Sequence, residues 1–146
     1  MSDLQVTQLD RLPPDRRSWL MSRVRAKNTA PEMTVRRLVH GLGYRYLVHS
    51  SSLPGKPDIV FRPRRKAIFV HGCFWHWHEN CRLARLPRSR LEYWLPKLSR
   101  NRERDAEAIA ALNSLGWSVH VVWQCELRNI DAVVAALLRF LAPTSN

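Results

Sequence analysis

Three histidines, two cysteines and two tryptophans lie within the eleven residues from His71 to Cys81. Cys73, His78 and Cys81 offer the thiolate and imidazole groups that zinc prefers as ligands. A third cysteine, Cys125, follows a predicted strand and could return to complete a tetrahedral site. Three thiolates and one imidazole would form the closed arrangement that is typical of structural zinc. The alternative is a set of reduced thiols beside an unrelated histidine.

Two further histidines of this segment, His71 and His76, are not needed for the zinc site. An imidazole has its unperturbed pKa near neutrality, so His76 can serve as a general base. His71 ends a predicted strand that pairs beside Asp58, where it could hold water or balance phosphate charge. The alternative is that one of the two histidines only packs in the core.

Two carboxylates are placed where a soluble fold rarely puts them. Asp105 lies seven residues from both Leu98 and Leu112, so in a helix it points along the apolar stripe. A carboxylate there needs a partner, which is either an arginine in a salt bridge or a catalytic histidine such as His76. Asp58 opens a short apolar strand directly after a proline, a position that can supply a metal ligand but also marks turns.

Large aromatic side chains accompany this polar segment. Phe74, Trp75 and Trp94 could wedge between base steps of DNA, although aromatic residues are more often part of a core. Trp94 lies between arginine-rich segments and is the better candidate for contact. Trp117 and Trp123 are predicted to be core residues because they alternate along a strand.

The elements that must position these residues follow a mixed α/β pattern. The capping-box motif Thr29-Ala30-Pro31-Glu32 predicts the start of a helix, and Gly41 and Gly43 predict its end. Strands are predicted at 44–49, 58–61, 66–71 and 117–123, and helices at about 96–115 and 131–141. Residues 1–15 are predicted to be a flexible arm, 16–25 a short basic helix, and 16–146 a single domain.

The charge of the chain is strongly positive. Lysine and arginine number 24 against 12 acidic residues, a formal net charge of +12, and 20 of the 24 are arginine. This balance favours a polyanionic partner such as nucleic acid; the alternatives are solubility or an anionic lipid surface. No apolar run is long enough to cross a bilayer and the start of the chain does not resemble a secretory signal, so a cytoplasmic protein is expected.

Six motifs, in this order, resemble those of the very-short-patch-repair mismatch endonucleases. They are Leu53-Pro54-Gly55-Lys56-Pro57-Asp58, Phe69-Val70-His71-Gly72-Cys73-Phe74-Trp75-His76, Glu92-Tyr93-Trp94-Leu95, Asn101-Arg102-Glu103-Arg104-Asp105, Leu115-Gly116-Trp117 and Val122-Trp123-Gln124-Cys125. The similarity runs from about residue 21 to about residue 128. Some family members have threonine at the position of Val70, and some have one residue fewer between His78 and Cys81.

The resemblance implies a restriction-endonuclease-like fold, a mixed α/β sheet flanked by helices, with a structural zinc. It implies a bacterial enzyme, monomeric and associated with the nucleoid, that nicks one strand of double-stranded DNA 5′ to the thymine of a T:G mismatch. Such mismatches arise when 5-methylcytosine deaminates, and the nick starts very short patch repair, with mismatch-repair proteins as possible partners. A restriction-type or defence nuclease acting on fully paired DNA is the alternative, and a zinc-stabilised DNA-binding module without catalysis is a third.

The resemblance also implies roles for individual residues. Asp58 and the backbone carbonyl of Val70 would bind catalytic magnesium, and His71 and Glu32 would contact water bound to that metal. Glu32 has a competing interpretation, because it is also the acid of the helix-capping motif.

His76, held by Asp105, would take part in activating the attacking water. The side chains implied to intercalate beside the mismatch are Phe74, Trp75 and Trp94, with Met21 entering from the other groove. Asp58, His71, His76 and Asp105 together argue against a pure binding module, which needs none of them.

Overall fold

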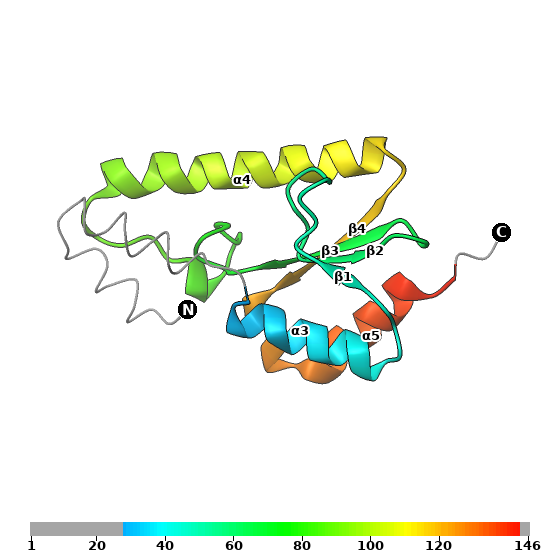
Figure 1. Cartoon of the computed structure of the whole chain (residues 1–146). Helices are drawn as coiled ribbons and strands as arrows, with labels where there is room; N and C mark the ends of the chain where they lie inside the picture. The colour runs from blue at the N-terminus through cyan, green and yellow to red at the C-terminus, as the bar shows by residue number, and fades with distance from the viewer. Residues whose placement is uncertain (1–27, 144–146) are drawn as a thin grey trace.

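A computed structural model describes residues 28–143, which form a four-stranded sheet between helices (Figure 1). The strands are β1 (Leu47–Val48), β2 (Ile59–Phe61), β3 (Lys66–His71) and β4 (Ser118–Trp123), in the spatial order β1-β2-β3-β4. The pairings β1–β2 and β2–β3 are antiparallel, and β3 pairs with β4 in parallel. The predicted mixed α/β fold is therefore confirmed.

Some predictions concern residues that the structure does not describe. The arm at 1–15, the basic helix at 16–25 and Met21 lie outside the described residues. The predicted extent of the single domain, 16–146, stays a prediction. Among the described residues, no helix is both long and apolar enough to span a membrane.

Helices cover both faces of the sheet. Helix α4 (Leu91–Ser114) runs along one face, and α3 (Ala30–Gly41) and α5 (Ile130–Leu141) run along the other (Figure 1). The larger core lies on the α3 and α5 side, where apolar side chains of the two helices meet those of the strands. Its buried members are Val35, Val39, Ile59, Phe61, Ile68, Val122, Val133, Leu137 and Leu141. This packing fixes the sheet on which the polar residues are mounted.

Helix α3 begins and ends where the sequence predicted. The Oγ1 of Thr29 accepts a hydrogen bond from the Glu32 N–H at 3.4 Å, as an N-cap residue does. The helix ends at Gly41, and Gly43 follows with a φ of +91° that favours glycine. The Glu32 side chain leaves the cap and points toward the sheet, as described below.

Helix α4 begins at Leu91, about one turn before the predicted start at 96, so that prediction was wrong. The prediction placed Pro96 in the first turn, where the missing N–H of proline costs no helical hydrogen bond. In the structure Pro96 lies inside the helix. Burial explains the extra turn, because Trp94 is fully buried and packs against Phe74 and Trp75. Leu98 and Leu112 are buried as predicted, but Leu115 is 56% exposed.

The strand predicted at 44–49 is reduced to Leu47–Val48. It ends because His49 takes a left-handed backbone conformation, with φ +50°, that does not continue a strand. Trp117 and Trp123 are half-buried and lie outside the two main clusters of buried residues, so the prediction that both are core residues was wrong. Trp123 contributes instead to a polar site, because its ring stacks on His78 at 4.0 Å between centroids.

Candidate active site and candidate metal centre

Asp58 lies directly before β2, at the edge where β2 and β3 meet. Its Oδ2 accepts a hydrogen bond from the Val70 N–H at 2.7 Å, and its own N–H donates to the Ile68 carbonyl at 3.1 Å. Burial raises the pKa of Asp58 to about 7; the Val70 hydrogen bond opposes this shift, and the nearby Glu32 carboxylate adds to it. A cation at this position would favour the charged form of Asp58, as metal ligation does.

Glu32 reaches the same place from α3. It is 3% exposed, and its Oε2 accepts hydrogen bonds from Arg36 and from the Nε2 of His49, the latter at 2.6 Å. Ligand atoms of Glu32, His49 and Asp58 all lie within 4.8 Å of one another. The cap uses only the backbone N–H of Glu32. The Glu32 side chain binds Arg36 and His49 beside Asp58, so it does not act as the reciprocal acid of the capping box.

Arg36 and His49 are site residues that the sequence analysis missed. Arg36 could have been found, since it lies four residues after Glu32 in a helix, where opposite charges pair. His49 gives no such local signal. It is brought to the site by the pairing of β1 with β2, and its N–H donates to the Asp58 carbonyl at 3.2 Å.

His71 and His76 stack on each other. Their ring centroids are 3.8 Å apart and their planes differ by 3°. Burial and, to a smaller extent, the charge of His76 together lower the pKa of His71 to about 3, against the opposing effect of Asp105. The buried Nδ1 of His71 has no hydrogen-bond partner among the described residues. His71 is therefore neutral at physiological pH and can accept a hydrogen bond or bind a metal, but it cannot act as an imidazolium acid.

His76 forms the predicted pair with Asp105. Its Nδ1 lies 2.6 Å from Oδ2 of Asp105, which α4 supplies from 29 residues away. Of the two partners that the sequence left open for Asp105, the structure gives the histidine. The Asp105 side chain is 24% exposed, which is less buried than its place on the apolar stripe predicted. A histidine that donates from Nδ1 to a carboxylate keeps Nε2 available as a proton acceptor.

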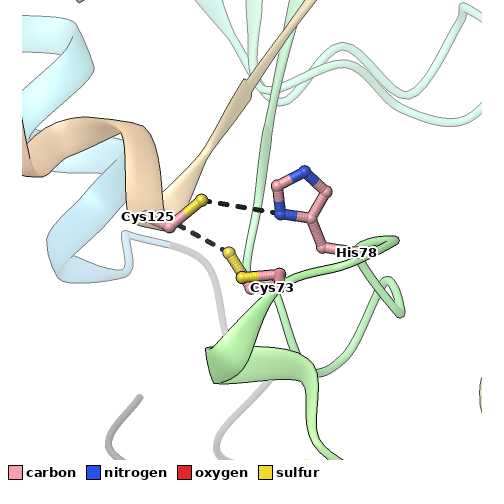
Figure 2. Close-up of side chains that lie close together, drawn as sticks. Cys73, His78 and Cys125 are labelled. Atoms are coloured by element: carbon pink, nitrogen blue, oxygen red, sulfur yellow. Dashed lines mark hydrogen bonds between the residues drawn. The ribbon is translucent and has the colours of Figure 1, made fainter.

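The four predicted zinc ligands converge. Ligand atoms of Cys73, His78, Cys81 and Cys125 all lie within 4.8 Å of one another. Figure 2 shows three of these residues: Sγ of Cys125 lies 3.5 Å from Nδ1 of His78, and the Cys125 N–H donates to Sγ of Cys73 at 3.3 Å. Cys125 lies in the short helix η2 (Gln124–Arg128) directly after β4, so the parallel β3–β4 pairing places it beside Cys73.

The chemistry of this cluster fits a metal. All three cysteines are free thiols, and burial raises the pKa of Cys73 to about 12 and also raises that of Cys125. Burial lowers the pKa of His78, so its ring favours the neutral form that coordinates metal. Buried thiols ionise when a bound cation compensates their charge. Three thiols and one imidazole are a set that suits zinc.

The three aromatic residues predicted to intercalate form a second core cluster. Phe74, Trp75 and Trp94 are 3%, 6% and 0% exposed, and Phe74 lies edge-on to both tryptophans. Asn101 of α4 ties this cluster down, because its Nδ2 donates to the Trp75 carbonyl at 2.9 Å. Intercalation by Phe74, Trp75 and Trp94 stays a prediction. Trp94, which was favoured as a contact residue because it lies between arginine-rich segments, is fully buried.

Comparison with known proteins gives consistent matches. Residues 9–83 match the sequence profile of the family described as DNA mismatch endonuclease Vsr. A Type II nicking enzyme, V.XorIIP of Xanthomonas oryzae pv. oryzae, is 56% identical over 135 residues, which is 92% of this chain and 98% of that protein. The DNA mismatch endonuclease Vsr of Escherichia coli is 45% identical over 112 residues, which is 77% of this chain and 71% of that protein. The Type II nicking enzyme V.NmeAIP of Neisseria meningitidis is 40% identical over 114 residues, 78% of this chain and 81% of that protein.

Proposed function

Because this chain belongs to the family of Vsr DNA mismatch endonucleases, we propose that it nicks one strand of duplex DNA 5′ to the thymine of a T:G mismatch. Membership makes it a nuclease that hydrolyses DNA phosphodiester bonds. The observation that carries the proposal is the His76–Asp105 pair, stacked on a neutral His71 at the end of β3. A mismatch nick of this kind would start very short patch repair of deaminated 5-methylcytosine.

His76 is the proposed general base. Asp105 holds Nδ1, so Nε2 can take a proton from the water that attacks the scissile phosphorus. The bond from phosphorus to the leaving oxygen then breaks, and one strand is cut. His71 stacks on His76 but has a lowered pKa and stays neutral. His76 is therefore the histidine of the pair that we propose gains the proton.

Asp58 and the backbone carbonyl of Val70 are the proposed ligands of a catalytic magnesium, and Glu32 and His71 are proposed to contact water bound to it. Carboxylate and carbonyl oxygens are ligands that magnesium prefers, and ligand atoms of Asp58 and Glu32 lie within 4.8 Å of each other. When bound, magnesium supplies positive charge that polarises the phosphate and stabilises the leaving oxygen. Arg36 and His49 both bind Oε2 of Glu32 and so fix this side chain beside Asp58.

The Cys73–His78–Cys81–Cys125 cluster is proposed to hold a structural zinc. The cluster would link the segment after β3, which also carries His76, to the residues that follow β4. A closed four-ligand site leaves no position for substrate, so its role would be to stabilise the fold. We further propose, from the family resemblance and the bacterial relatives, a monomer that acts in the bacterial cytoplasm near the nucleoid, with mismatch-repair proteins.

Two labelled duplexes of the same sequence test the proposed substrate, one with a single T:G mismatch and one fully paired. With magnesium, we expect a nick in the thymine-containing strand of the mismatched duplex, mapped 5′ to the thymine on a sequencing gel. The paired duplex should stay intact, and removal of divalent metal should stop the reaction. Equal nicking of both duplexes would contradict mismatch specificity.

A second candidate is a nuclease that nicks fully paired DNA. The name of the Xanthomonas relative, Type II nicking enzyme, supports this second candidate because it mentions nicking but not a mismatch. The paired duplex in the same assay distinguishes it, because this candidate predicts cutting at a sequence-defined position without any mismatch.

A further inference from the structure

Two neighbouring cavities form one groove beside His76. The first, of about 510 Å³, is lined by His71, His76 and Asp105. The second, of about 370 Å³, lies over the loop that holds His78 and Cys81. The cavities are contiguous because Trp77, His78, Glu79, Asn80 and Arg102 line both of them. The second cavity therefore adjoins the one that contains the proposed base.

The second cavity is positively charged. Arg82, Arg85 and Arg102 contribute three guanidinium groups to its lining, against the single carboxylate of Glu79. All three arginines are exposed, so a ligand can reach them without any rearrangement of the core. One guanidinium group can donate two parallel hydrogen bonds to two phosphate oxygens. An arginine cluster is therefore a better phosphate site than a lysine cluster.

Arg102 is held in place before any ligand arrives. Its Cζ lies 4.3 Å from the centroid of the Trp77 ring, and its Nη2 donates to the Trp77 carbonyl. The loop below is itself fixed, since the Trp77 N–H donates to the Phe74 carbonyl and the His78 N–H to the Cys73 carbonyl. A side chain that is already ordered loses little conformational entropy on binding. This distinguishes Arg102 from an ordinary solvated arginine.

The arginine cluster lies close to the proposed general base. Arg102 lies three residues before Asp105 on α4, so the two side chains project one turn apart along the same helix. Trp77 directly follows His76 in the chain. Helix α4 and the loop that carries His76 and Trp77 therefore each connect the proposed base to the arginine cluster.

We propose that this groove binds the phosphodiester backbone beside the scissile bond, with a phosphate seated among Arg82, Arg85 and Arg102. The proposal rests on the proposed function, since it assumes that the scissile phosphate lies at His76. The contact would be independent of sequence, because it reads no base edge. It would fix the register of the cut strand against the base, and the zinc cluster would hold the loop that carries half of the groove.

Salt-dependent binding to a fully paired duplex tests the groove separately from nicking. Fluorescence anisotropy over a potassium chloride series gives the slope of log affinity against log salt, whose magnitude is about 0.9 for each phosphate that the protein neutralises. We expect Arg102→Ala and Arg85→Ala each to reduce the slope by about that amount and to weaken binding about tenfold at moderate salt. The matched control is Arg100→Ala, an exposed arginine of α4 that does not line the groove, and its slope should equal that of the wild type.

Nicking under single-turnover conditions, at saturating protein, separates binding from chemistry. Arg100→Ala, which lies outside the groove, should then cut the T:G duplex at the wild-type rate, whereas Arg102→Ala should cut it more slowly because the bound strand has lost part of its register against His76. Unchanged slopes for both Arg102→Ala and Arg85→Ala would overturn the groove. A slope reduced equally by Arg100→Ala would also overturn it, because the effect would then be one of overall charge. If the wild type cuts no T:G duplex but the two slopes still fall, the groove stands and the proposed function fails.

Discussion

At the scale of single residues, Glu32 is held more firmly than the other groups of the site. Arg36 and His49 both bind its Oε2, and the side chain is almost fully buried. Two buried carboxylates side by side repel each other, and the raised pKa of Asp58 records part of that repulsion. Arg36 therefore supplies the positive charge that allows Glu32 to approach Asp58.

Removing that charge should destabilise the fold. We expect Arg36→Ala to lower the free energy of unfolding by about 3 kcal/mol, because it leaves a buried carboxylate without its cation. The measurement is urea unfolding of the two variants Arg36→Ala and Arg37→Ala. Arg37 is the exposed neighbour on the same helix, and its replacement should change stability by no more than about 0.5 kcal/mol. Equal destabilisation in both variants would show that Arg36 has no special role.

The pKa of Asp58 predicts a pH dependence for metal binding. Burial raises this pKa to about 7, so below pH 7 the carboxyl is mainly protonated and a metal must displace the proton. The magnesium concentration that gives half-maximal nicking should therefore rise as the pH falls, by about tenfold per unit below pH 7. Above pH 7 it should level off. Magnesium titrations at pH 6.0 and 8.0 check this, and a requirement independent of pH would contradict it.

Sequence reasoning went furthest where ligand chemistry is local. The proposed zinc ligands Cys73, His78 and Cys81 lie within one short segment, where residue type alone predicted that they could share a metal, and their ligand atoms lie within 4.8 Å of one another. His49 could not be found this way, because its place beside Glu32 depends on how β1 pairs with β2 and on a left-handed backbone turn. Such a contact is a property of the fold and leaves no spacing in the sequence.

At the scale of elements, the parallel pairing of β3 and β4 determines the site. Its register sets His71 opposite Trp123, so the residues that follow each strand, Cys73 and Cys125, emerge together. The sequence predicted both strands and proposed that Cys125 returns to Cys73. It did not predict the early start of α4, because burial of Trp94 outweighs the local preference of Pro96 for a first turn.

A zinc ion bound by the proposed cluster should stabilise the fold by linking the ends of these two strands. We expect one zinc ion per chain by metal analysis, and a melting temperature at least about 5 °C lower after chelation or in Cys125→Ala. The physical reason is that the metal binds only where the four ligands are assembled, so binding adds to the free energy of unfolding. Readdition of zinc should restore the wild-type melting temperature but not that of Cys125→Ala. An unchanged melting temperature after complete metal removal would contradict a structural zinc.

At the scale of the whole molecule, the described residues place the proposed catalytic cluster and the proposed metal cluster beside one sheet that has helices on both faces (Figure 1). Composition alone predicted a nucleic-acid partner from the net charge of +12, and the pattern of elements predicted the α/β class. Neither could show that Phe74, Trp75 and Trp94 pack together, since an aromatic wedge and a core aromatic have the same local sequence. That distinction needs the three-dimensional packing.

The single-turnover rate of nicking by His76→Ala decides whether His76 is the general base, with the T:G duplex fully bound to excess protein. We predict a fall on the order of 10²–10⁴ relative to wild type, which is the contribution of a general base, with DNA affinity and melting temperature retained. Asp105→Asn should also be slow, because it removes the carboxylate that orients His76. A His76→Ala variant that nicks the bound mismatch at the wild-type rate would contradict this role of the His76–Asp105 pair.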